Sequence, residues 1–418
     1  MLSSVQFRDF KALRDAHLDD LERLTVLVGP NGSGKSSVLE AVHYVTQLGT
    51  RSFGSIFTHE RDPRHLIRRG TEELFIGISG EWSGRPGALS LSVVRQVIQR
   101  PPPDEPLERH TVEVKGSSGD QQYESKDAED VLWDHLKDLG SQVSRAVFLR
   151  LEASNLARPS YSERRIPRVE YDGRGLASVV GFMAGNQPEQ FKGLVQTLRR
   201  IVPTVEAVRV ERAELVLAKE TVPDDVLGAG DGRGSGVGAG YGPGAGDGKG
   251  SGTGYGWGAG ARQRGWDPPP RRVWGEALVF DMCGAPNLPA HAVSEGTLLT
   301  LGLLAVLCGP SQPRLVLLDD LDRALHPLAQ KSLVEVIRGL QQERPELQIL
   351  ATSHSPYLLD HLRHDEVRLT TLTPAGEAVC ARLSEHPDFE RWKELMTPGE
   401  LWSSFGEQWF GQSRAEGR

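Results

Sequence analysis

The chain has 418 residues, of which 38% are hydrophobic and 25% are charged. These proportions are ordinary for a globular protein, and the length allows two or three domains. The net charge of −8 and an isoelectric point near 5.9 exclude a uniformly basic coat for nucleic acid, but they leave room for a local basic strip.

The first elements predicted along the chain are a strand and a helix joined by a glycine-rich turn. Residues 25–28 form a short apolar run, which is typical of a buried strand, and a helical pattern extends from 35 to 48. Alternating or apolar runs separated by turn residues follow, and they predict an antiparallel β-meander. Its expected strands are 74–78, 89–93 and 112–114, and helical patterns come next at 131–139 and 188–201.

A glycine tract interrupts the chain after these elements. From 228 to 260 every even-numbered residue is glycine. Such a tract has almost no apolar side chains to offset its ordering entropy, so we expect a flexible insertion over 227–269. Two interpretations stay open: a tolerated loop expansion, and a segment whose aromatic residues Tyr241, Tyr255 and Trp257 bind a partner.

The remainder of the chain predicts helices that alternate with short buried strands. The expected helices are 295–308 and 327–340, and the expected strands are 315–318, 348–352 and the antiparallel pair 367–372 and 378–382. This alternation predicts an α/β fold, with a mostly parallel sheet covered by helices, an antiparallel β subdomain and a helical insertion lobe.

The spacing of the cysteines and the length of the apolar runs indicate the cellular compartment of the protein. Cys283, Cys308 and Cys380 lie far apart and show no C-x-x-C spacing, which argues against a disulfide framework or a zinc site. The N-terminal residues lack the apolar region of a secretion signal, and no run of 18 apolar residues is present. We therefore expect a cytoplasmic protein without a membrane partner.

The strongest motif lies between the first predicted strand and helix. It matches G-x-x-x-x-G-K-S and consists of Gly29, Pro30, Asn31, Gly32, Ser33, Gly34, Lys35 and Ser36, with Ser37 next in the helix. The glycines let backbone N–H groups turn inward around an anion, and the helix N-terminus adds partial positive charge. We expect Lys35 to reach the β and γ phosphates of ATP and the Ser36 hydroxyl to ligate Mg²⁺.

Two acids follow the strand predicted at 315–318. Asp319 stands at the carboxyl end of that strand, where open α/β sheets place their ligands. Alone, a strand ending in two acids is more typical of a surface turn. Beside the phosphate-binding loop, we expect Asp319 to hold Mg²⁺ and Asp320 to polarise the attacking water.

Two further motifs have ordinary interpretations when taken alone. Ser294, Glu295 and Gly296 open a predicted helix, where a serine followed by an acid is a normal N-cap. His354 follows the strand 348–352, and a lone histidine there is usually structural. It comes one αβ unit after the acid-tipped strand, however, which places it at the same edge of the sheet.

With these motifs in this order, the chain resembles the ABC-type ATPases of the SMC/RecF/OLD branch, and in particular the stand-alone, OLD-like AAA-family ATP-binding proteins. The matching stretches are F-R-D-F-K-A-L at 7–13, the phosphate-binding loop, S-E-G-T at 294–297, L-L-D-D…L-H-P at 317–327, T-S-H-S-P-Y-L-L-D at 352–360 and G-E-L-W…G-E-Q-W at 399–409. The stretch after His354 is too short for a TOPRIM nuclease domain, so none is expected.

The resemblance implies a P-loop NTPase fold of ABC-ATPase type and a division of the chain. The ATPase comprises 1–60 and 270–418, a β-meander and helical lobe comprises 61–226, and the glycine-rich insertion comprises 227–269. The resemblance also implies a homodimer, in which Ser294 contacts the γ-phosphate of a nucleotide held by the opposite subunit and Glu295 and Gly296 also bind that nucleotide. His354 is then the switch histidine.

The implied activity is ATP hydrolysis that drives a switch. Its expected targets are DNA or a separately encoded nuclease or toxin, in defence against mobile DNA or in DNA repair. The alternative is an ATP-gated dimerising scaffold with little turnover. Asp320 favours that alternative, because the family usually has Glu there and a carboxylate one methylene shorter is displaced by about 1.5 Å.

Other positions also depart from the family pattern. Residues 321–324 replace the usual P-E-N-G, and no glutamine between 48 and 95 marks a Q-loop. The C-terminal aromatic residues suit either a docking patch or a terminal helix packed on the ATPase. They are Trp392, Trp402, Phe405, Trp409 and Phe410.

Overall fold

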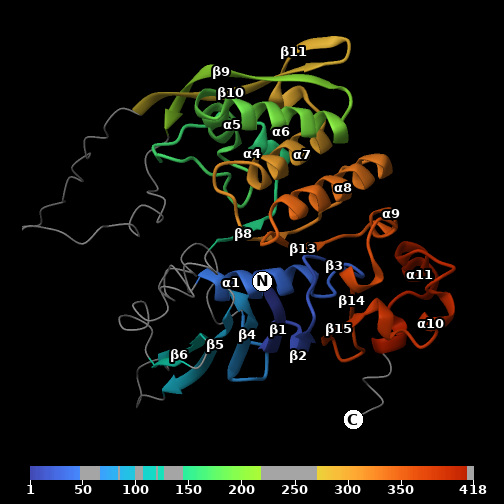
Figure 1. The fold of residues 1–418 in the computed structure, drawn as a ribbon. Coiled ribbons are helices and arrows are strands. Elements are labelled where there is room, and N and C mark those ends of the chain that lie inside the picture. The colour runs from blue at the N-terminus through green and yellow to red at the C-terminus, as the bar shows by residue number, and fades with distance from the viewer. Residues whose placement is uncertain are drawn as a thin grey trace, which may run out of the picture. The chain divides into compact units, whose positions relative to one another are not determined.

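The computed structural model describes residues 1–47, 66–82, 85–98, 107–118, 121–126, 145–217 and 271–411 (Figure 1). The helix expected at 131–139 and the glycine tract lie outside these ranges. One unit of the chain comprises Met1–Leu215 and Trp274–Arg418, and Val216–Val273 forms a second unit.

The central sheet has six strands in the order β15-β14-β3-β13-β12-β8. Their bounds are β3 Leu24–Val28, β8 Ala146–Leu149, β12 Leu315–Leu318, β13 Gln348–Thr352, β14 Val367–Leu372 and β15 Ala378–Arg382. Neighbouring strands are parallel, except that β14 and β15 are antiparallel. Short strands of buried residues are typical of a parallel sheet covered on both faces, and the α/β prediction is confirmed.

A second sheet is antiparallel, with the order β2-β1-β4-β5-β6-β7. Its strands are β1 Leu2–Phe10, β2 Leu13–Leu18, β4 Glu73–Trp82, β5 Arg85–Ile98, β6 Leu107–Ser118 and β7 Gln121–Lys126. The predicted meander is confirmed as β4, β5 and β6. The two N-terminal strands extend this sheet, because β1 pairs with β4 and sets Val5 opposite Ile78.

Helix α1 (Lys35–Gln47) packs between the two sheets. One hydrophobic cluster contains Val38 and Val42 of α1, Phe7 of β1, and Leu317 and Leu350 of the central sheet. Because both sides of the helix are buried, its first turn is held in place beneath the loop that precedes it.

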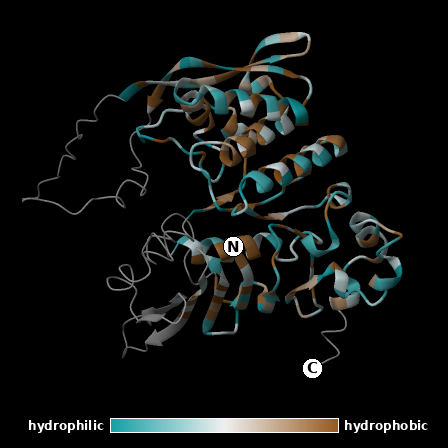
Figure 2. Ribbon diagram, in the orientation of Figure 1, coloured by the Kyte–Doolittle hydropathy of each residue, from teal (hydrophilic) through white to brown (hydrophobic). Residues whose placement is uncertain are grey.

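A helical lobe follows β8. It contains α4 Ala153–Leu156, α5 Leu176–Asn186 and α6 Pro188–Ile201, and it is joined by α7 Glu295–Leu307 and α8 Pro327–Glu343. A three-stranded sheet, β11-β10-β9, belongs to the same region, with β9 Val205–Leu217, β10 Arg271–Met282 and β11 Ala285–Pro289. Figure 2 shows hydrophobic residues gathered along the central strands and the inner helices. Helix α7 is buried from Gly296 to Leu307, which explains its almost continuous apolar sequence.

The C-terminal part of the described chain contains the short helices α9 Pro356–Leu359, α10 Phe389–Trp392 and α11 Pro398–Phe405, and β14 and β15 lie between α9 and α10. Phe410 is buried in the main core. The other four C-terminal aromatic residues are partly buried and pack against that core. This packing favours a docked terminal helix over an open docking patch.

Candidate nucleotide site

The loop between β3 and α1 has a backbone that requires glycine. Gly29, Gly32 and Gly34 have φ angles of 147°, 78° and 97°. A Cβ atom on Gly29 would lie 2.0 Å from the Thr370 carbonyl oxygen, and one on Gly34 would lie 2.9 Å from the Cβ of Ala378. Both the positive φ angles and the close approach to β14 and β15 therefore exclude larger residues at Gly29 and Gly34.

Thr370 of β14 ties this loop to the sheet. Its hydroxyl donates to the Val28 carbonyl at 3.1 Å and lies 2.7 Å from the Ser33 hydroxyl. Because Thr370 donates to Val28, Ser33 must be the donor of the second bond. Ser33 is buried, whereas Pro30, Asn31 and Gly32 are exposed. The loop is thus anchored on its inner side and open on its outer side.

Lys35 begins α1 and is buried against the loop. Its Nζ donates to the carbonyl oxygens of Gly29 and Pro30, both at 2.8 Å. Burial lowers the pKa of Lys35, and the negative charges of four carboxylates oppose that effect. These carboxylates belong to Asp320, Asp319, Glu407 and Asp322, in decreasing order of effect.

Ser36 and Asp319 meet, although 283 positions separate them in sequence. The Ser36 hydroxyl lies 3.0 Å from each carboxylate oxygen of Asp319. Thr352, the last residue of β13, donates to Oδ1 of Asp319 at 2.7 Å. Nε of Arg150 lies 4.0 Å from Oδ2. Hydroxyl and carboxylate oxygens are hard ligands, so this donor set fits Mg²⁺.

Asp320 and His354 lie side by side next to this pair. Nε2 of His354 is 4.0 Å from Oδ1 of Asp320, and each side chain is 41% exposed. Asp320 has a positive φ of 60°, and its N–H donates to the Thr352 hydroxyl at 2.8 Å. Burial and the charge of Asp319 raise the pKa of Asp320, while His354 acts in the opposite direction.

Ser294, Glu295 and Gly296 do not contact the phosphate-binding loop of the same chain. Ser294 holds the N-cap position of α7, but its hydroxyl bonds to the Thr297 hydroxyl at 2.8 Å and caps no backbone N–H. Glu295 pairs with Arg323 at 2.9 Å. Gly296 is packed so closely that a Cβ atom would lie 2.3 Å from the Ala324 carbonyl oxygen. Over the described residues, no hydrogen bond or ion pair joins these three residues to 29–37.

Ser37 also lies in the first turn of α1 and is half-buried, with no hydrogen bond to the acids among the described residues. Three residues of the site were absent from the sequence predictions: Thr352, Thr370 and Arg150. Thr352 lies inside the T-S-H-S-P stretch that pointed to His354. Thr370 and Arg150 carry no local signal, because they reach the site through the pairing of β14 with β3 and of β8 with β12.

A glycine-rich loop that opens a helix, beside an acid-tipped strand of a mostly parallel sheet, defines a P-loop ATPase of ABC type. A solved structure, the SMC head bound to the C-winged helix domain of ScpA, has the same fold. Its TM-score is 0.50 at 13% sequence identity, and the match covers 93% of this chain and 99% of that chain.

The family described as "AAA domain, putative AbiEii toxin, Type IV TA system" matches residues 24–360. The chain belongs to this family.

Curated relatives match shorter stretches. The DNA replication and repair protein RecF of Chlorobium luteolum is 40% identical over 93 residues, which is 22% of this chain and 23% of that protein. RecF of Clostridioides difficile is 32% identical over 76 residues, or 18% and 19% of the two chains. The chain thus spans less than a quarter of the length of these relatives.

Among the residues that the structure describes, no helix is long and apolar enough to cross a bilayer. The same residues contain no group of three or more His, Cys, Asp or Glu side chains suited to a metal ion. A magnesium ion bound here would have the Ser36 hydroxyl and the Asp319 carboxylate as protein ligands and would take further oxygens from a nucleotide's phosphates.

Proposed function

We propose that the chain binds ATP with Mg²⁺ and hydrolyses it to open and close a homodimer. The observation that carries this proposal is the meeting of Ser36 with Asp319, with Thr352 holding the carboxylate. A hydroxyl and an anionic oxygen at the mouth of a glycine-rich loop are the ligands that a nucleotide-bound Mg²⁺ requires.

Each side chain has a distinct role in this proposal. The inward N–H groups of 29–36 bind the phosphates, and Lys35 leaves its loop carbonyls to contact the β and γ phosphates. Ser36 and Asp319 hold Mg²⁺, which neutralises charge that develops on the phosphates. Asp320 orients the attacking water and accepts its proton, and His354 beside it responds to the γ-phosphate.

The placement of Ser294 and Glu295 supports a dimer. Both side chains are exposed at the start of α7, and neither is bonded to the phosphate-binding loop of its own chain. Leu328 at the start of α8 is 72% exposed, and Tyr357 at the start of α9 is 60% exposed. These apolar side chains lie in the segments that follow β12 and β13, so a second copy can cover them while it offers Ser294, Glu295 and Gly296 to the opposite nucleotide.

The biological target belongs to the same proposal. RecF is named for DNA replication and repair, and the matching family is described as a toxin of a toxin–antitoxin system. We propose a cytoplasmic, OLD-like ATPase that acts on DNA or on a separately encoded nuclease or toxin, in defence or in repair. In this proposal residues 1–60 and 270–418 form the ATPase, to whose central sheet β8 adds a strand. The rest of 61–226 forms the insertion lobe, and 227–269 are the glycine-rich insertion.

A mixing experiment tests hydrolysis across a dimer. Lys35→Ala removes the lysine of one site, and Ser294→Glu sets a negative charge against the γ-phosphate in the opposite site, at a helix start that tolerates acids. Each variant alone should hydrolyse ATP at about one hundredth of the wild-type rate or less. An equimolar mixture should recover about a quarter of the wild-type rate, because half the dimers are mixed and each has one intact site.

The matched control is a mixture of Lys35→Ala with Asp319→Asn. These substitutions damage the same half of a site, so every mixed dimer has two damaged sites and no rate should return. If the Lys35→Ala and Ser294→Glu mixture also stays inactive, although both proteins are folded and dimeric, the composite site is wrong.

A further inference from the structure

Arg323, in the loop that follows β12, joins the start of α7 to the residues that follow β8. Its Nη2 lies 2.9 Å from Oε1 of Glu295, which is in the first turn of α7, and donates to Oε2 of Glu152 at 3.4 Å. Its Nη1 donates to the Leu151 carbonyl at 3.4 Å. Both carboxylates contact the same nitrogen, so without the charge of Arg323 they would repel each other. The arginine therefore fixes where Glu295, and with it the first turn of α7, can lie.

The backbone of the same loop packs directly on the start of α7. A Cβ atom on Gly296 would lie 2.3 Å from the Ala324 carbonyl oxygen, so this approach requires glycine. On its other side the loop is tied to the candidate site, because the Arg323 N–H donates to the Asp320 carbonyl at 3.1 Å. The loop thus lies between Asp320 and the start of α7.

The contacts of Arg323 contribute little to the stability of the fold, because all three charged side chains are partly exposed. The Arg323 side chain is 37% exposed, and those of Glu152 and Glu295 are each 42% exposed. Ion pairs with this much exposure are screened by water and add little to the free energy of unfolding. Among the described residues, the Arg323 side chain makes no hydrogen bond or ion pair with Asp319, Asp320 or the phosphate-binding loop. Its closest contact is with the start of α7, and none is with the residues proposed to hold nucleotide in its own chain.

We infer that Arg323 is a positioning residue for the segment 294–296, which it holds in the place where that segment meets the nucleotide of a second copy of the chain. This inference rests on the proposed function. Ser294 directly precedes Glu295 and both are exposed, so the contact that fixes Glu295 also fixes the hydroxyl offered to the opposite nucleotide. Loss of Arg323 should therefore damage the site of the opposite copy and leave the site of its own chain intact.

Mixtures of variants identify the site that Arg323 serves. Arg323→Ala alone should hydrolyse ATP at about a tenth of the wild-type rate or less, because small displacements of a reacting group are costly. In an equimolar mixture with Lys35→Ala, the rate should return to about a quarter of the wild-type rate, since each mixed dimer has one intact site. A mixture with Ser294→Glu should give no more than the mean of the two separate rates, because both substitutions damage the segment that a copy offers to its partner.

A second measurement does not depend on hydrolysis. In the Asp320→Asn background, which should keep the dimer closed in ATP, Arg323→Ala should raise the dissociation constant of the dimer by about tenfold. Analytical ultracentrifugation with ATP and Mg²⁺ gives this constant. Arg323→Lys keeps a positive charge between the two acids but loses the planar guanidinium, so it should recover part of the loss in both measurements.

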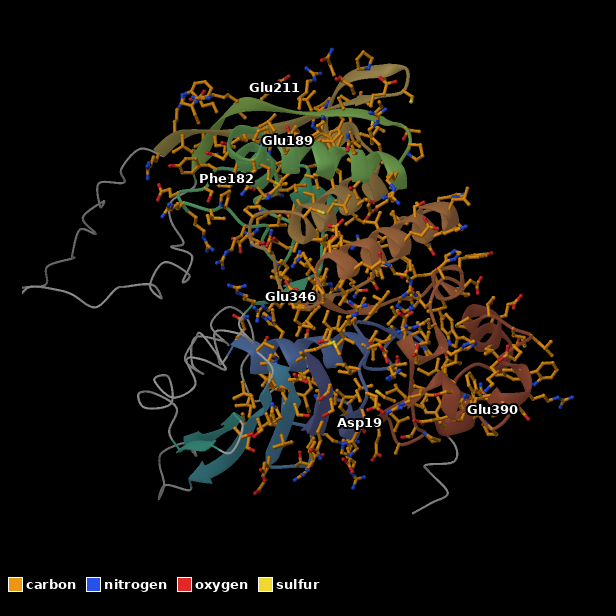
Figure 3. The ribbon with its side chains drawn as sticks, viewed as in Figure 1. Asp19, Phe182, Glu189, Glu211, Glu346 and Glu390 are labelled. Carbon is orange, nitrogen blue, oxygen red and sulfur yellow. The ribbon has the colours of Figure 1, made fainter. Side chains whose placement is uncertain are left out.

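Two matched variants serve as controls. Arg209→Ala removes an arginine that is 42% exposed and pairs with Asp281 at 2.8 Å. Glu189→Arg reverses the charge of an acid in the first turn of α6 (Figure 3), as Glu295→Arg does in the first turn of α7. Both controls should keep the wild-type rate and the wild-type dimer, whereas Glu295→Arg should behave as Arg323→Ala does in the mixtures.

The mixtures also define the results that overturn the inference. Recovery with Ser294→Glu in place of Lys35→Ala assigns Arg323 to the site of its own chain. Recovery with neither assigns it a structural role, and a wild-type rate for Arg323→Ala assigns it no role, so each of these results overturns the inference. If Lys35→Ala and Ser294→Glu fail to complement each other, the shared site itself is wrong and the proposed function fails with it.

Discussion

Asp319→Asn should abolish magnesium-dependent ATP hydrolysis and lower kcat by about 100-fold or more. The Asp319 side chain is 5% exposed and accepts hydrogen bonds from Ser36 and Thr352. The amide oxygen of asparagine can still accept from Thr352, so the fold should persist. The asparagine side chain, however, lacks the negative charge that holds Mg²⁺. Phosphate release measured over a range of Mg²⁺ concentrations gives the result.

The control for this variant is Asp15→Asn, the same change at an exposed acid on β2. It should keep the wild-type rate and the wild-type response to Mg²⁺. If Asp319→Asn hydrolyses ATP at a rate within a few-fold of the wild-type rate, Asp319 is not a magnesium ligand. The two acids after β12 then have only the ordinary role of acids in a turn.

Asp320→Asn should separate nucleotide binding from hydrolysis. The amide cannot accept a proton from water, so kcat should fall by about 100-fold or more while the affinity for Mg·ATP changes little. Because hydrolysis opens the proposed dimer, this variant should remain dimeric in ATP while the wild type returns to monomer. Phosphate release and size-exclusion chromatography with ATP report the two effects.

Asp320→Glu separates the ATPase from the scaffold alternative. The longer side chain restores the residue that this family of ATPases usually has. If the wild type hydrolyses ATP only at background and Asp320→Glu raises turnover greatly, the protein is a nucleotide-gated scaffold. A wild-type rate well above background, and lost in Asp320→Asn, supports the ATPase.

Local patterns predicted much of the central sheet. Strands β3, β12 and β13 and helices α1 and α6 lie within a few residues of their expected positions, because each is an apolar run or an amphipathic pattern with its own ending signal. Strand β8 was not predicted. It has four residues, Ala146–Leu149, and it is a strand because it pairs with β12.

The residues of the candidate site likewise include some that local motifs predicted and some that they did not. The motifs predicted that Ser36 and Asp319 would share a site, because Ser36 follows β3 and Asp319 follows β12 at the carboxyl edge of one parallel sheet. Thr370 and Arg150 could not be predicted, since they reach the site through the pairing of β14 with β3 and of β8 with β12.

Isothermal titration calorimetry of the intact chain with ATP and Mg²⁺ tests the central claim most directly. The account predicts a binding heat at a stoichiometry of one nucleotide per chain, and an affinity about tenfold or more weaker in Lys35→Ala, which lacks the ammonium that meets the phosphates. No heat at millimolar ATP from a chain shown to be folded would contradict the account.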